Sequence, residues 1–156
     1  MAKKIQLNQL ADQLRSALGK EKAAIEKNAE TAVRMAAIKT FAKIIKMTPV
    51  GNADKWQTPV QGYVGGRARS NWMLGSTLTN ETTDSTDGKN NGEEYIRTEL
   101  PSSPLLDNKT YFYNNLPYIN RLEYGSHSKQ APNGMVRVSL LGWNRTLNNA
   151  FKDLSE

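Results

Sequence analysis

The first 47 residues carry the pattern that most constrains how this chain can fold. Apolar side chains recur every three or four positions, at Leu7, Leu10, Leu14 and Leu18 and then at Ile25, Ala29, Ala32, Val33, Ala36, Phe41, Ile44 and Ile45. This is the spacing of one face of an α-helix, and most residues between them are good helix formers. The sequence therefore predicts a long helix over residues 7–47.

Two features bear on the limits of this helix. Gly19 is the plausible interruption, so the pattern fits either a short helix followed by a long one or a single bent helix. Lys46 favours the negative end of the helix dipole, and Pro49 disfavours a helical conformation at Thr48. We expect the helix to end near Met47.

A glycine-rich segment follows, with residues 51–65 predicted as a loop. Arg67 and Arg69 come directly after it and allow two interpretations. As guanidinium groups on a loop they could meet phosphate or the carboxylates of a neighbouring molecule. Alternatively, each forms an ion pair within its own chain, and the sequence leaves both interpretations open.

Residues 70–114 are predicted to form a small, mostly antiparallel sheet. The segment at Trp72 has the composition of a strand entry, and residues 94–100 and 110–113 are rich in β-formers. The polar stretch between residues 79 and 92 has almost nothing to bury, so it is expected to be a loop or a hairpin tip.

Two helices are predicted after the sheet. Pro117 suits the first turn of a helix and Gly125 suits its end, which indicates a short helix over residues 117–124. Apolar residues then recur at helical spacing from Val136 to Leu154 and predict a C-terminal helix over residues 134–154. The 156 residues therefore fit one α+β domain, with the long helix packed on the sheet.

The net charge of +6 is unevenly distributed. Residues 1–50 hold ten Lys or Arg against four acids, and residues 51–156 hold eleven against eleven. Such a basic segment can attract nucleic acid, although the solvated face of a long helix has the same composition. The sequence shows no signal-peptide pattern and no membrane span, so a soluble protein made in the cytoplasm is expected.

Few catalytic arrangements are compatible with this sequence. There is no cysteine, and His127 is the single histidine, which excludes thiolate zinc sites and paired-histidine metal sites. Neighbours such as Ser126, His127 and Glu123 seldom meet in triad geometry. Asp84 lacks the downstream ligand of a calcium loop, and the glutamates show no recognisable magnesium spacing. We therefore expect no enzyme activity, no bound metal and no cofactor.

Three blocks of the chain resemble a known family. They are Thr48-Pro49-Val50, then Gly66 to Trp72, then Asn114 to Gly125 with Gln130 to Arg137. Together they are similar to the tail-completion or neck proteins of long-tailed bacteriophages, the group that includes minor tail protein Z of lambda-like phages. The resemblance covers nearly the whole chain, except that residues 51–65 look like an insertion.

This resemblance implies a non-enzymatic virion protein with an α+β fold. It would form a homo-oligomeric, hexameric ring at the head-proximal end of the tail and join the tail to the head. Its partners would be tail terminator or tube proteins and head connector proteins, with possible contact to DNA in the lumen and none with a membrane. Head-to-tail contacts between identical subunits close such rings.

The residues expected to make contacts between subunits follow from the same resemblance. Aromatic and arginine side chains supply much of the anchoring energy at protein interfaces. The candidates are Arg67, Arg69, Trp72, Tyr113, Tyr118, Arg121, Glu123, Tyr124, Gln130 and Arg137. Leu116, Ile119 and Leu122 are expected to face the core instead.

The alternative function is a stand-alone basic nucleic-acid-binding protein, with or without a metal-dependent nuclease activity. It predicts tight DNA binding that weakens steeply with salt, and a monomer or dimer in solution. A ring protein instead predicts self-assembly, so the oligomeric state and the salt dependence separate the two interpretations.

Overall fold

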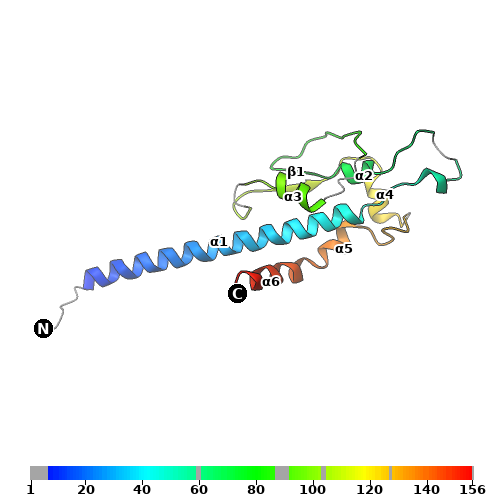
Figure 1. Cartoon of the computed structure of the whole chain (residues 1–156). Coiled ribbons are helices and arrows are strands. Elements are labelled where there is room, and N and C mark those ends of the chain that lie inside the picture. The colour runs from blue at the N-terminus through cyan, green and yellow to red at the C-terminus, as the bar shows by residue number, and fades with distance from the viewer. Residues whose placement is uncertain (1–6, 59–60, 87–91, 103–104, 127, 156) are drawn as a thin grey trace.

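A computed structural model describes residues 7–58, 61–86, 92–102, 105–126 and 128–155. Helix α1 (Leu7–Met47) is one uninterrupted helix of 41 residues, roughly 60 Å long at 1.5 Å per residue. It continues through Gly19, so of the two alternatives a single helix is present and not a short helix followed by a long one (Figure 1). The helix ends where predicted, and the Thr48 hydroxyl donates to the carbonyl of Ile44 at 2.8 Å.

The C-terminal half of α1 is the axis of the folded body. Helix α6 (Trp143–Asp153) runs along one side of it, and α3 (Gly92–Glu99) packs on the other side, together with the sheet (Figure 1). Ala32 and Ala36 of α1 and Ala150 of α6 are completely buried. Small side chains at these positions let the two helices approach closely.

The sheet has two antiparallel strands, β1 (Met73–Gly75) and β2 (Tyr111–Tyr113), with Leu74 opposite Phe112. A lone pair of strands is marginal in water, so packing must stabilise it. The Phe112 ring stacks on Phe41 of α1 at 4.5 Å and on Trp72 at 4.7 Å between centroids. The sheet is thereby fixed to α1, and the predicted α+β class is confirmed.

The predicted strand at residues 94–100 is wrong, because this segment is helix α3. Glu93 lies in its first turn, where a carboxylate favours the helix dipole, and it pairs with Arg97 one turn later at 2.7 Å. Ile96 and Leu100, four residues apart, are both buried in the core. Helical spacing of these two side chains outweighs the β-propensity of the Tyr, Ile and Thr in the segment.

The C-terminal part differs from the prediction in detail. Helix α4 (Ile119–Tyr124) begins two residues after Pro117, and the single helix expected over residues 134–154 is two, α5 (Val136–Leu140) and α6. Gly142 caps α6, and its carbonyl accepts hydrogen bonds from both the backbone N–H and the hydroxyl of Thr146.

Short helical turns complete the chain: η1 (Ala53–Lys55) in the predicted loop and α2 (Arg67–Ser70) before β1. The hydrophobic core gathers residues from α1, α3, the sheet region and the start of α5. Its buried members are Ala37, Ile38, Ile44, Ile45, Trp72, Ile96, Leu100 and Met135. Within the described ranges, no helix has both the length and the apolar character that crossing a membrane requires.

Candidate interaction surfaces

Arg69 and Trp72 close the C-terminal end of α1. The Arg69 guanidinium donates to the carbonyls of Lys46 at 3.0 Å and Thr48 at 2.9 Å, which are acceptors left unpaired at a helix end. The Trp72 indole N–H donates to the Thr48 hydroxyl at 2.7 Å, and Trp72 is buried. Burial lowers the pKa of Arg69. Both predicted interface residues therefore make contacts inside the subunit.

Arg67 lies on α2 rather than on a loop, and it makes an intramolecular ion pair. Its guanidinium contacts the Asp84 carboxylate at 2.8 Å and donates to the carbonyl of Thr83 at 3.3 Å. The Asn71 side chain holds the same segment, donating to the Thr83 carbonyl and accepting from the Thr83 N–H. The sequence leaves open whether Arg67 contacts another molecule or forms an ion pair within its own chain. In the structure it forms the ion pair within its own chain.

Glu123 of α4 caps the N-terminus of α5. Its buried carboxylate accepts the backbone N–H groups of Met135, Val136 and Arg137 at 2.8 to 3.0 Å. Arg137 also reaches back, donating from Nε to the carboxylate at 3.2 Å and from Nη2 to the Glu123 carbonyl at 2.7 Å. Gly134, at φ +83°, brings the backbone so close that a Cβ there would overlap Glu123.

The pKa of Glu123 reflects this network. Burial alone would raise it, but the hydrogen bonds from the N–H groups of Arg137, Met135 and Val136 and from the Arg137 side chain bring it below its ordinary value. The carboxylate is therefore charged at neutral pH and balanced by its donors. Glu123 and Arg137 form a structural pair within the subunit, and the sequence pattern showed neither this partnership nor its burial.

Three predicted contact residues of the segment around α4 are exposed: Tyr118, Arg121 and Tyr124. Tyr124 is 65% exposed, and the Arg137 guanidinium lies over its ring, 4.7 Å from the centroid. Tyr113 is half-buried, with its hydroxyl 3.0 Å from that of Thr79. The structure thus leaves the outer side of α4 accessible to another molecule.

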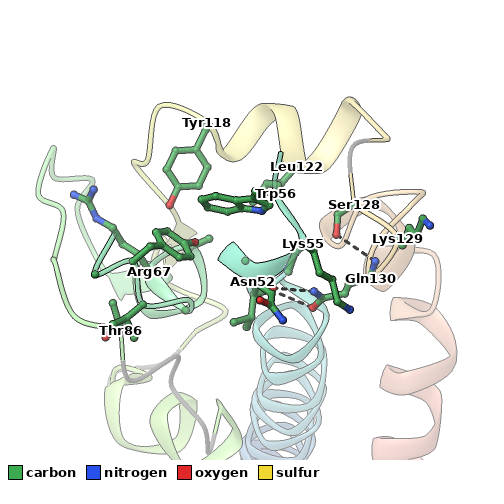
Figure 2. Close-up of a pocket in the computed structure, with 18 residues that line it drawn as sticks. Asn52, Lys55, Trp56, Arg67, Thr86, Tyr118, Leu122, Ser128, Lys129 and Gln130 are labelled. Carbon is green, nitrogen blue, oxygen red and sulfur yellow. Dashed lines mark hydrogen bonds between the residues drawn. The ribbon is translucent and has the colours of Figure 1, made fainter. Parts of the chain in front are cut away.

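An open groove of about 1000 Å³ lies at the C-terminal end of α1, bounded by residues 51–56, residues 62–64 and α4 (Figure 2). Trp56, Tyr63 and Tyr118 contribute aromatic rings to it, and the first two rings pack 4.6 Å apart. Gln130 joins its wall by exchanging two hydrogen bonds with the backbone of Val50, at 3.1 and 2.9 Å.

Basic side chains surround this groove, namely Lys55, Arg67 and Lys129, and none of the described residues that line it is acidic. Figure 2 shows Arg67 at one end and Lys129 at the other, with Trp56 between them. Trp56 and Tyr63 were missed as candidates because the segment was treated as an insertion. Both aromatic residues lie in a polar, glycine-containing loop, where neither helix nor strand spacing explains them. This is the sequence signal that indicates a surface role for them.

The N-terminal half of α1 projects beyond the body (Figure 1). From Asp12 to Asn28 each residue is exposed, and this part includes Leu14, Leu18 and Ile25 at 56%, 64% and 69% exposure. Together with Ala32 and Ala36, these three side chains lie on one face of α1. Helix α6 covers this face only where α1 is part of the folded body. We call Leu14, Leu18 and Ile25 the exposed stripe.

No group of three or more potential metal ligands occurs in the part of the chain that the structure describes. His127 lies outside the described residues, so the structure does not test an arrangement of Ser126, His127 and Glu123. Searches against protein-family models, curated proteins and solved structures each find no match to this chain. Its function is therefore argued from its own surfaces.

Proposed function

We propose that this protein is a structural component of a bacteriophage virion, which forms a homo-oligomeric, hexameric ring at the head-proximal end of the tail. The ring completes the tail and joins it to the head through contacts with tail terminator or tube proteins and with head connector proteins. The sequence blocks described above suggest this family, and the surfaces of the subunit support an assembling, non-enzymatic role.

The exposed stripe is the observation that carries the proposal. Burying one leucine or isoleucine side chain stabilises a protein by about 1.5–3 kcal/mol. A subunit that leaves three such side chains exposed on one projecting helix lacks several times this stabilisation unless a neighbouring subunit covers them. Isolated helices are also only marginally stable in water, so a partner would hold this half of α1 in its helical form.

The position of a second surface supports ring closure. The groove beside Trp56 and Tyr118 lies near the C-terminal end of α1, and the exposed stripe lies on the N-terminal half of the same helix. One surface is a convex helix and the other is concave. Two different surfaces at opposite ends of a subunit permit head-to-tail contacts, which generate a closed ring when the rotation between subunits closes.

Deleting the gene from the phage that carries it tests the proposal. We expect DNA-filled heads and separate, unjoined tails to accumulate, and a copy of the gene supplied in trans to restore joined particles. A copy with serine at both Leu14 and Leu18 should restore few or none. Normal numbers of joined virions after deletion would contradict the proposed function.

A further inference from the structure

A small cleft of about 260 Å³ lies between α1 and α6, away from the groove and the exposed stripe. Lys39, Thr40 and Lys43 of α1 line one wall, and Arg145 and Asn149 of α6 line the other. Lys39 and Lys43, like Arg145 and Asn149, are one turn apart, so each pair lies on one face of its helix.

The charges in this cleft are of one sign. Among the described residues that line it, three are cationic and none is acidic. Lys39 has one distant partner, Asp153 at 3.9 Å, and both side chains are more than half exposed, so water screens that pair. Among the described residues, no ion pair involves Lys43 or Arg145. Bringing three like charges together is unfavourable, and an anion between them would relieve the repulsion.

Neutral hydrogen-bond donors accompany the cations. Thr40 is only 4% exposed and lines the cleft, where its hydroxyl can serve as a neutral donor. Gly142, the N-cap of the 11-residue helix α6, also lines the cleft, and no side chain caps this helix. The first N–H groups of α6 and its positive dipole end therefore favour a negative group at this place.

We propose that this cleft binds a phosphate group, with Lys39, Lys43 and Arg145 balancing its charge and Thr40, Asn149 and the first turn of α6 donating hydrogen bonds. A phosphate carries up to two negative charges on several acceptor oxygens, which matches several cations and convergent donors better than a single carboxylate does. The space of about 260 Å³ accommodates such a group.

The phosphate is either free in solution or part of a DNA backbone. The DNA source rests on the proposed function, since a ring at the head–tail junction encloses the DNA that passes through it. Arg67 and Arg69 were the sequence-based candidates for such contact, but their donors are taken by Asp84 and by backbone carbonyls. Lys43 and Arg145 of the cleft, which form no ion pair with a described residue, are available in their place.

Amide NMR spectra of the full chain test the site directly. Titrating inorganic phosphate against chloride at constant ionic strength should shift the amide signals of Gly142 to Arg145 in a saturable manner. Replacing Arg145→Gln should weaken phosphate binding about tenfold or more, the usual consequence of losing a charge-assisted hydrogen bond. Thr40→Val should also weaken it, at unchanged charge.

The control is Arg121→Gln, which removes one exposed positive charge from α4 and should leave phosphate affinity unchanged. Three results would each overturn the proposed site. They are an equal loss of phosphate affinity in Arg121→Gln, equal amide shifts with acetate, and no saturable amide shift in the wild-type chain. Should Thr40→Val fail to fold, Arg145→Gln alone decides, because Arg145 is exposed and its replacement creates no cavity.

A short duplex DNA separates the two sources. If the backbone supplies the phosphate, DNA should shift the same amides and Arg145→Gln should reduce its affinity. Phosphate binding without these DNA effects would identify free phosphate as the ligand. Phosphate binding to a chain that never assembles would refute the ring alone, whereas ring assembly without phosphate binding would refute this site alone.

Discussion

At the scale of single residues, several side chains expected at a subunit interface instead hold helix ends together. Arg69 satisfies the last carbonyls of α1, and Glu123 satisfies the first N–H groups of α5. Polar groups at buried helix ends need partners, so these residues are needed for folding before any assembly begins. Mutations at such positions should act on stability first.

Replacing Glu123→Gln should lower the free energy of unfolding by about 2 kcal/mol or more, because an amide has one acceptor oxygen where the carboxylate has two. Urea denaturation measures this change. Glu93→Gln is the matched control, since it removes one partner of an exposed pair on α3 and should change stability by less than about 1 kcal/mol. Equal effects in both variants would contradict the capping role.

Acid should destabilise the protein through two carboxylates with lowered pKa values. Burial alone would raise the pKa of Glu30, but hydrogen bonds from the backbone N–H groups of Leu105 and Leu106 and from Arg34 lower it by more, so the pKa lies below its ordinary value. The pKa of Glu123 is lowered in the same way. Their stabilising effect is complete above the unfolded pKa of about 4.3 and is lost as pH falls through the lower folded value. Thermal melts below pH 5 should show this loss, and it should be smaller in Glu123→Gln.

Tyr124→Ala should behave differently from Glu123→Gln, because Tyr124 is mostly exposed and contacts its own chain mainly through Arg137. We expect a folded subunit with a nearly unchanged melting temperature and reduced self-assembly. Circular dichroism and light scattering measure the two properties. Wild-type assembly by this variant would remove Tyr124 from the interface.

At the scale of elements, the sequence predicted those whose signals are local and strong. The apolar spacing and Pro49 gave α1 and its end, and the aromatic run at Tyr111 gave β2. Helix α3 was missed because Ile96 and Leu100 show their helical spacing only once α1 provides a core to face. The internal partners of Arg69 and Glu123 come from segments 12 to 23 residues away, which no local pattern reveals.

Gly19→Ala should stabilise the projecting half of α1. A Cβ at Gly19 would meet nothing within 4 Å, and alanine is better than glycine in a helix interior by about 1 kcal/mol. Hydrogen exchange at the amides of residues 12–28 should slow about fivefold. In contrast, Gly134→Ala should lower global stability, because Gly134 has a positive φ and a Cβ there would overlap Glu123. Faster exchange in Gly19→Ala would contradict the exposed, regular helix at this position.

At the scale of the whole molecule, the two ends of α1 have different chemistry. The N-terminal end presents the exposed stripe, and the C-terminal end lies beside the aromatic and basic groove. A net charge of +6 opposes non-specific association of identical chains. Self-assembly should therefore depend on apolar contacts of the exposed stripe more than on salt.

Replacing both Leu14 and Leu18 by serine should leave the body folded and prevent oligomers from forming. These side chains contribute nothing to the core, so the melting temperature of the body should change little. Sedimentation over a range of concentrations measures the assembly. Leu106→Ser, at another exposed leucine, is the control. Unchanged oligomers in the double variant would show that the exposed stripe is not the contact.

The continuity of α1 through Gly19 has a mechanical consequence. One stiff rod joins the exposed end to a base that Arg69, Trp72 and the sheet clamp firmly. The projecting part is about 33 Å long, so a tilt of a few degrees at the base moves its tip by about 2 Å. In the ring that we propose, we expect this lever to let each chain follow small changes in the spacing of its neighbours while its own body stays unchanged.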